Sequence, residues 1–458
     1  MFYLLASIML ASCGCPDAKD HNGLIEQAQM HEQVVNGQGD NNIIKTVTEF
    51  FGTIVGTSPY PGVRSTYGNN DLMVQVSQIN QDLALLIGHD KAAKYMDEHH
   101  LSINSPRIML SGKVEGTGFI ANDASGHVRS DIGLTGAELD ILAAYKSLTA
   151  FMVIQYLNFP SPVINNRITN SNLFLDVAFL TIGDLNQAPF YVTLGQTFVP
   201  FGQYNSYNGF NDPLTKILFR TIAEDATIGY YDETFLGQFF FFRGDSHADS
   251  GNNINNYGFN LGVNYHIGEI KNLLQFSFMR NVADALGMQL AFANSRNTNT
   301  LSHVVPGCNI NGGTHIGHWH FVYEYGFAVR RFAKADASIS NNGGKNFKGA
   351  RPQAYDLECS YQYKIADRDA ALSLGYSRSF DALGFNMPRW RTVLTWTYYI
   401  FDGTLLSLEY MHNQLYPRKS VAGGQLAFGP GGSTPYFRQA NHKGRSDDTL
   451  TLDISFYW

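Results

Sequence analysis

The sequence predicts an all-β protein, a closed antiparallel transmembrane β-barrel of about 16 strands with a small, partly helical N-terminal segment. From Arg107 onward, apolar and polar residues alternate with a period of two, in stretches of about ten residues or more. The chain begins with an apolar export signal and ends in TLTLDISFYW, an alternating strand that finishes on Trp458. A sheet can span lipid only if it closes on itself, because every backbone N–H and C=O group then finds a partner.

The composition excludes helical membrane proteins and proteins that bind nucleic acid. After the first dozen residues, no apolar run reaches the roughly 18 residues of a spanning helix, and the mean hydropathy is -0.16. A net charge of -7 provides no basic surface for nucleic acid. Charged residues make up only 16% of the chain and aromatic residues 13%, which is typical of a β-rich membrane protein.

The first 15 residues, MFYLLASIMLASCGC, have the length of a signal peptide. Leu10 to Cys13 resembles the bacterial lipobox, which predicts acylation of Cys13. No Lys or Arg precedes the apolar run, so ordinary cleavage nearby and an uncleaved segment stay open. Cys308 and Cys359 could pair in an oxidising compartment or remain thiols.

Residues 16–105 form a separate N-terminal segment, which we expect either in the periplasm or as a plug inside the barrel. Apolar residues at helical spacing predict two helices joined by a turn-rich loop. One set is Ile43, Val47, Phe50, Phe51 and Ile54, and the other is Ile79, Leu83, Leu86 and Ile87.

Residues 106–458 form the predicted barrel, whose last strand must pair with its first. Alternation indicates strands near 107–119, 129–146, 148–160, 171–184, 190–199, 226–232, 235–243, 256–267, 272–280, 285–293, 318–330, 331–340, 353–364, 368–379, 389–401, 404–415 and 449–458. The segments 285–293 and 331–340 alternate least clearly, and bacterial single-chain barrels have even strand numbers, so we predict 16. The polar loops 201–225, 294–317, 341–352 and 416–448 are expected outside.

The strand parity opposite to the aromatic face predicts the residues that line the lumen. These are Lys113, Glu115, Glu138, Asp140, Lys146, Asp176, His318, His320, Glu324, Arg330, Asp356, Glu358, Lys364 and Arg391. All except Lys146 and Lys364 are candidate ligand contacts, and the alternative is that these charges pair with one another in a wet interior.

Two further stretches contain residues that could form a site. His315, His318 and His320 in HIGHWH are too widely spaced along one strand for a single ion, so a polar wall is favoured over a metal site. VPFGQYNSYNGFNDP (199–213) predicts either a constriction loop that folds inward or an outer vestibule. No nucleophile elbow, phosphate loop or HExxH motif occurs, so we expect neither enzymatic activity nor a cofactor.

Four stretches resemble the legiobactin-receptor-type siderophore porins of the bacterial outer membrane. They are SPYPGVRSTYGNNDLMVQVSQINQDLALL (58–86), PRIMLSGKVEGTGF (106–119), GLTGAELDILA (133–143) and FYVTLGQTFVPFGQYN (190–205). The resemblance covers the N-terminal segment and the first third of the barrel. It implies a sixteen-stranded barrel that imports an iron-siderophore complex without energy coupling.

We therefore expect a bacterial outer-membrane porin that passes small hydrophilic solutes by diffusion. The expected partners are outer-membrane lipid, the barrel assembly machinery and the solute, which the resemblance specifies as an iron-siderophore complex. A general or anion-selective porin, or a plugged structural or adhesin barrel, is the alternative. The sequence does not indicate the oligomeric state.

Overall fold

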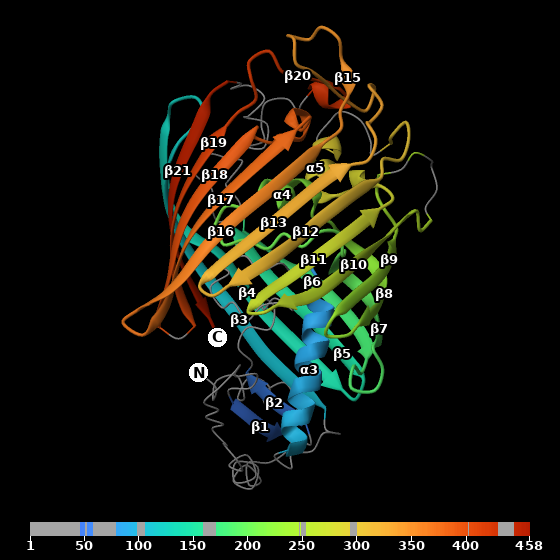
Figure 1. Cartoon of the computed structure of the whole chain (residues 1–458), viewed down its shortest axis with the longest axis vertical. Helices are drawn as coiled ribbons and strands as arrows, with labels where there is room; N and C mark the ends of the chain where they lie inside the picture. Colours follow the sequence, from blue (N-terminus) through green and yellow to red (C-terminus); the bar gives the residue numbers. More distant parts are fainter. Residues whose placement is uncertain are drawn as a thin grey trace, which may run out of the picture.

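The computed structural model describes residues 46–50, 53–57, 79–98, 106–158, 171–246, 248, 253–293, 300–401, 403–428 and 444–458. Within these residues, 16 strands form one closed antiparallel barrel (Figure 1). The barrel strands are β3 (Arg107–Asn122), β4 (Val128–Tyr145), β5 (Leu148–Asn158), β6 (Ser171–Gly183), β7 (Phe190–Phe198), β8 (Ile222–Tyr231), β9 (Phe235–Phe242), β10 (Asn256–Ile267), β11 (Ile270–Met279), β12 (Gly307–Ile316), β13 (Trp319–Ala328), β16 (Gln353–Ile365), β17 (Arg368–Phe380), β18 (Trp390–Phe401), β19 (Thr404–Gln414) and β21 (Ser446–Tyr457).

The barrel closes where the last strand meets the first. β21 pairs with β3 from Asp448 opposite Asn122 to Tyr457 opposite Lys113. Trp458 extends this ladder, because Gly112 N–H donates to its carbonyl at 2.9 Å and its own N–H donates to the carbonyl of Gly112 at 3.0 Å. A Cβ atom on Gly112 would lie 2.8 Å from the indole ring, so glycine is required for the terminal tryptophan to cover the seam.

The two ends of the barrel differ in the length of their connections. Two-residue turns at 146–147, 268–269, 317–318 and 366–367 lie at the same end as Trp458. The longer connections 199–221 and 329–352 leave and rejoin the sheet at the opposite end, as do the described residues 280–293, 300–306, 415–428 and 444–445 of two others. Because barrels of this kind have short periplasmic turns and long outer loops, the end that carries Trp458 is the periplasmic one.

The alternation separates an apolar outer face from a polar inner one. On β16, Leu357 is 52% exposed, whereas its neighbours Asp356 and Glu358 are 2% and 4% exposed. Leu261, Leu374 and many other large apolar side chains are exposed in the same way around the sheet. This apolar belt on a closed barrel locates the protein in a bacterial outer membrane.

The predicted strand number is correct, but three segments were assigned wrongly. Residues 285–293 are not a strand, because Leu286–Ala293 forms helix α5 in an outer loop. Residues 331–340 are not a barrel strand either, since only Ala337–Ser340 is extended (β14), and it pairs with β15 (Lys348–Gly349) and β20 (Val421–Gly424) in a small separate sheet. The prediction missed β12, which lies between β11 and β13.

Other elements gather at the outer end, as Figure 1 shows for β15, β20 and α5. They include the short 3-10 helices η2 (Val282–Asp284), η3 (Leu383–Phe385) and η4 (Gln425–Phe428), whereas helix α4 (Leu214–Phe219) lies against the inner wall at β13, β16 and β17. Buried aromatic rings connect α5, η3 and the segment between β13 and β14. The ring centroid of Phe292 lies 5.6 Å from that of Phe332 and 5.8 Å from that of Phe385. Among the described residues, no helix is long and apolar enough to cross a membrane.

The N-terminal segment is only partly helical. Helix α3 (Gln81–Glu98) confirms the helix expected around Leu83. The helix expected over 43–54 is wrong, because Thr46–Phe50 (β1) and Thr53–Thr57 (β2) form a hairpin. Strand β2 continues the barrel sheet by pairing in parallel with the start of β3, from Ile54 opposite Arg107. Edge pairing thus overrides the helical spacing of the apolar residues.

Cys308 and Cys359 lie on different strands, β12 and β16, and both are free thiols. The alternative that they form a disulfide is therefore wrong. The predicted lipidation site Cys13 lies outside the described residues and stays a prediction.

Candidate functional site

The connection between β7 and β8, residues 199–221, folds into the barrel and contacts the opposite part of the wall. It leaves the sheet at β7, yet its hydrogen bonds reach strands β11, β13, β16, β17, β18 and β19. Phe201, Tyr204 and Tyr207 within it are buried. Of the two predictions for VPFGQYNSYNGFNDP, the structure has the inward loop, which we call the constriction loop.

Two glutamates of the wall hold the first half of the constriction loop. The carboxylate of Glu324 on β13 accepts the backbone N–H groups of Gln203 at 3.2 Å and Tyr204 at 2.7 Å. Glu358 on β16 accepts the hydroxyl of Ser206 at 2.6 Å and the N–H of Tyr207 at 2.7 Å. A buried segment that forms no helix or strand needs such side-chain acceptors for its backbone N–H groups.

A third carboxylate, Glu409 on β19, holds the tip of the loop. It accepts the backbone N–H groups of Gly209 at 2.6 Å, Phe210 at 3.0 Å and Asn211 at 3.0 Å. The side-chain amide of Asn211 donates to the same carboxylate at 2.5 Å. Glu409 is 1% exposed, so these donors replace water around a buried acid.

The second half of the loop turns back through α4. The Nη1 atom of Arg391 on β18 donates to the carbonyl of Asp212 at 2.5 Å, and Lys216 pairs with the Asp212 carboxylate at 2.7 Å. Leu218 and Phe219 are fully buried and anchor α4 against the wall. The loop is therefore fixed by polar contacts along its first half, and by both polar contacts and apolar packing along its second.

Gly202 shows why the local sequence permits this fold. Its φ of +87° lies in the left-handed region, and a Cβ atom would come within 2.6 Å of the Glu324 Oε1 atom and 2.5 Å of the Tyr204 ring. Glycine at this position lets the chain turn tightly enough for the next two N–H groups to reach one carboxylate.

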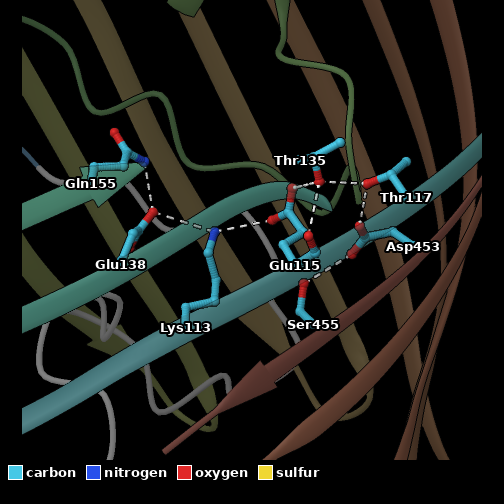
Figure 2. A network of polar contacts seen from close by, with 8 residues as sticks. All are labelled: Lys113, Glu115, Thr117, Thr135, Glu138, Gln155, Asp453 and Ser455. Carbon is cyan, nitrogen blue, oxygen red and sulfur yellow. Dashed lines mark hydrogen bonds and ion pairs between the residues drawn. The ribbon is translucent and has the colours of Figure 1, made fainter. Parts of the chain in front are cut away.

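A network of polar side chains lies on another part of the wall, on strands β21, β3, β4 and β5 (Figure 2). Its centre is Lys113, whose Nζ atom lies 3.1 Å from Glu115 Oε2 and 3.6 Å from Glu138 Oε1. The side-chain amide of Gln155 donates to Glu138 at 2.8 Å, and Thr135 donates to Glu115 at 2.9 Å.

The same network crosses the seam of the barrel. Thr117 of β3 donates to Asp453 of β21 at 2.8 Å, and Ser455 donates to the other carboxylate oxygen at 2.9 Å (Figure 2). The seam thus has side-chain hydrogen bonds on the lumen side and the Trp458 ring on the outer side.

The structure places most of the predicted lumen residues on the inner face. Those pointing inward or buried are Lys113, Glu115, Glu138, Asp140, Asp176, His320, Glu324, Asp356, Glu358 and Arg391. Asp140 accepts the hydroxyl of Ser111 at 3.1 Å, and Asp356 accepts the hydroxyl of Ser377. The ring of His320 lies 6.1 Å from that of Tyr207 and stacks on His315 at 3.9 Å between centroids.

Four predicted residues do not line the wall. His318 is exposed in the turn 317–318, with its ring 5.9 Å from Tyr361 on the outer face. Arg330 follows β13 in an outer loop, where it donates to the carbonyl of Val304. Lys146 lies in the turn after β4 with its ammonium over the Tyr145 ring, and Lys364 is exposed near a periplasmic turn. Parity fails for His318, Arg330 and Lys146 because these residues lie outside the strands, whereas Lys364 lies in the last turn-proximal residues of β16, where the wall ends and its side chain is exposed.

Three buried carboxylates on the described barrel strands were not predicted from the sequence. They are Asp225, Glu409 and Asp453. The parity signal was present for two of them, since Glu409 alternates with Leu408 and Tyr410, and Asp453 alternates with Leu452 and Ile454. Nothing in one sequence indicates which lumen acid contacts a loop more than a hundred residues away.

The chain is similar to known proteins both in sequence and in structure. No family model matches the chain. A UPF0422 protein of Legionella pneumophila (strain Lens) is 31% identical over 432 residues, which cover 90% of this chain and 78% of that protein. A UPF0422 protein of Coxiella burnetii is 27% identical over 422 residues, covering 90% and 86%. The structure of Salmonella typhi OmpF in complex with daunomycin superposes on this chain with a TM-score of 0.50 at 12% identity. The superposition covers 77% of this chain and 97% of that one, and it shows that the folds are similar.

Proposed function

The chain belongs to the UPF0422 family, and we propose that it is an outer-membrane porin through which small hydrophilic solutes diffuse past the constriction loop. The observation that carries this proposal is the inward loop held by Glu324, Glu358 and Glu409. A structural barrel needs no such device, whereas a channel needs a fixed narrow point to set a size limit. The porin fold of OmpF supports the same conclusion only at the level of architecture.

The charges of the wall support passage of neutral or cationic solutes over anions. On the strands, the inward acids are Glu115, Glu138, Asp140, Asp176, Asp225, Glu324, Asp356, Glu358, Glu409, Asp447 and Asp453, while the buried or half-buried inward bases among the described residues are Arg107, Lys113 and Arg391. The field inside a narrow pore follows the charge on its wall, which disfavours the anion-selective alternative.

Liposome swelling with sugars of graded size tests the porin proposal. We expect small sugars to enter at rates that fall sharply above one size, as a fixed constriction requires. Empty liposomes and liposomes with heat-denatured protein are the controls. A barrel that admits no sugar under any condition, in any variant described below, would contradict the proposal.

An iron-siderophore complex is the solute that we propose within this class. Support comes from the sequence resemblance in the N-terminal segment and the first barrel strands. Growth of a deletion strain in iron-limited medium, with and without purified siderophore, tests it separately from sugar passage. Equal growth of the deletion strain and its complemented parent on the siderophore would reject the iron solute and leave the porin proposal standing.

A further inference from the structure

The first turns of α3 lie against the inner wall of the barrel near the periplasmic end. Leu83 and Leu86 are fully buried and pack with Tyr191 and Leu236, which point inward from β7 and β9. Leu85 and Ile79 are also buried, in the apolar cluster that contains the constriction loop. In Figure 1 the helix extends from the barrel at the end where the C-terminus lies.

The wall under this helix is apolar, unlike the wall of a hydrated channel. The inward residues that belong to the same clusters are Phe151, Val153, Val177, Phe179, Tyr191 and Leu236. The lumen side of an outer-membrane barrel is normally polar, because water covers it. An inward apolar patch on β5, β6, β7 and β9 is stable when another apolar surface covers it, and α3 supplies that surface.

Polar contacts fix the position of the helix and connect it to the constriction loop. The hydroxyl of Thr193 on β7 donates to the Asp82 carboxylate at 2.6 Å, and both residues are buried. The side-chain amide of Asn80 donates to Gln203 of the constriction loop at 3.4 Å. The helix therefore occupies a specific place on the solute path, between the loop and the periplasmic mouth.

We propose that residues 79–89 form a periplasmic gate that must leave the wall before solutes can pass. The proposal rests on the porin function, since a gate has meaning only in a channel. A helix with its side chains is about 10–12 Å across. Together with the constriction loop, an object of this width leaves little of the lumen of a 16-stranded barrel open. The gate sets how often the channel conducts, while the constriction loop sets which sizes pass.

The first test locks the gate in place. Asp82→Cys and Thr193→Cys are introduced together across a contact that now measures 2.6 Å between oxygen atoms. A short bis-methanethiosulfonate joins them, because each cysteine thiolate forms a reducible disulfide with the reagent and displaces methanesulfinate. The single-cysteine variants are the controls for labelling and for any reaction at Cys308 or Cys359. We expect the joined protein to pass no small sugar in liposome swelling, and reduction to restore passage.

The second test displaces the gate without altering a strand. Leu83→Asp places a charge against Tyr191 and Leu236, which burial strongly disfavours. We expect the swelling rate to rise about tenfold or more, with the size limit unchanged because the constriction loop is intact. Heat-modifiability on gels confirms that the variant barrel is folded.

The outcomes separate the gate from the porin function. If sugars passed through the cross-linked protein as fast as they do after the cross-link is reduced, the gate would be overturned and the porin function would stand. Failure of the reagent to join the two cysteines in the assembled barrel, or an unchanged rate in folded Leu83→Asp, would also overturn the gate. If neither the reduced protein nor Leu83→Asp passes any sugar, the porin function fails and the gate fails with it.

Discussion

Removing the carboxylate of Glu409 should release the tip of the constriction loop while leaving the barrel assembled. Glu409→Ala leaves three backbone N–H groups, those of Gly209, Phe210 and Asn211, without an acceptor. At a net value of roughly 1 kcal/mol for each hydrogen bond, the loss is roughly 3 kcal/mol. The loss destabilises the attachment of the loop and not the barrel sheet, since the backbone pairing of β19 with its neighbouring strands is unchanged.

A loss of that size raises the population with a detached tip by roughly a hundredfold. Hydrogen exchange in detergent micelles, followed at residues 209–211, should therefore accelerate by about two orders of magnitude. Asp453→Asn is the matched control, because it alters an equally buried lumen carboxylate whose contacts are Thr117 and Ser455 instead of the loop. Unchanged exchange in Glu409→Ala, or the same acceleration in Asp453→Asn, would refute the anchoring role.

Three further predictions address the membrane face, the outer loops and the seam. Leu357→Arg at mid-strand should destabilise the barrel by about 2–4 kcal/mol in lipid vesicles, measured by denaturant unfolding, and no loss would contradict the assigned outer face. Burial raises the pKa of Asp284 in the outer loops to about 6, so its contribution to local stability is fully present below about 3.8 and is lost as the pH rises through 6. After correction for the intrinsic exchange rate, hydrogen exchange in residues 282–293 should therefore be slower at low pH than at pH 7.5. Asp284→Asn should abolish that difference. Deleting residues 456–458 should prevent assembly, because it removes the partners of Val114, Lys113 and Gly112; normal membrane levels of the truncated protein would contradict the closure.

The barrel was predictable because its strands follow a simple physical rule. Lipid outside and water inside force a period of two, and this period is clear in strands such as β16, where Leu357 alternates with Asp356 and Glu358. The rule fails for β12, GCNINGGTHI, because its outer face carries few large apolar residues and its Asn and Gly content resembles a loop. It fails for LGMQLAFA, since a short apolar run does not distinguish a strand from a buried helix.

The candidate site was predictable only in part. Parity identified Glu324 and Glu358 as lumen residues, and composition singled out the loop after β7. That these two features bind each other was not predictable, because the contact joins Tyr204 to a residue 120 positions away and depends on the closed barrel. The position of α3 was left open for the same reason.

Single-channel recording with polymers of graded size tests most directly whether the constriction loop determines the narrowest point. The double variant Glu358→Ala/Glu409→Ala removes the acceptors for Tyr207 and for residues 209–211. We predict that it carries a larger current than the parent protein in planar bilayers and admits larger polyethylene glycols. Identical conductance and identical polymer exclusion in the folded double variant would contradict the claim that this loop, held by these glutamates, sets the size limit.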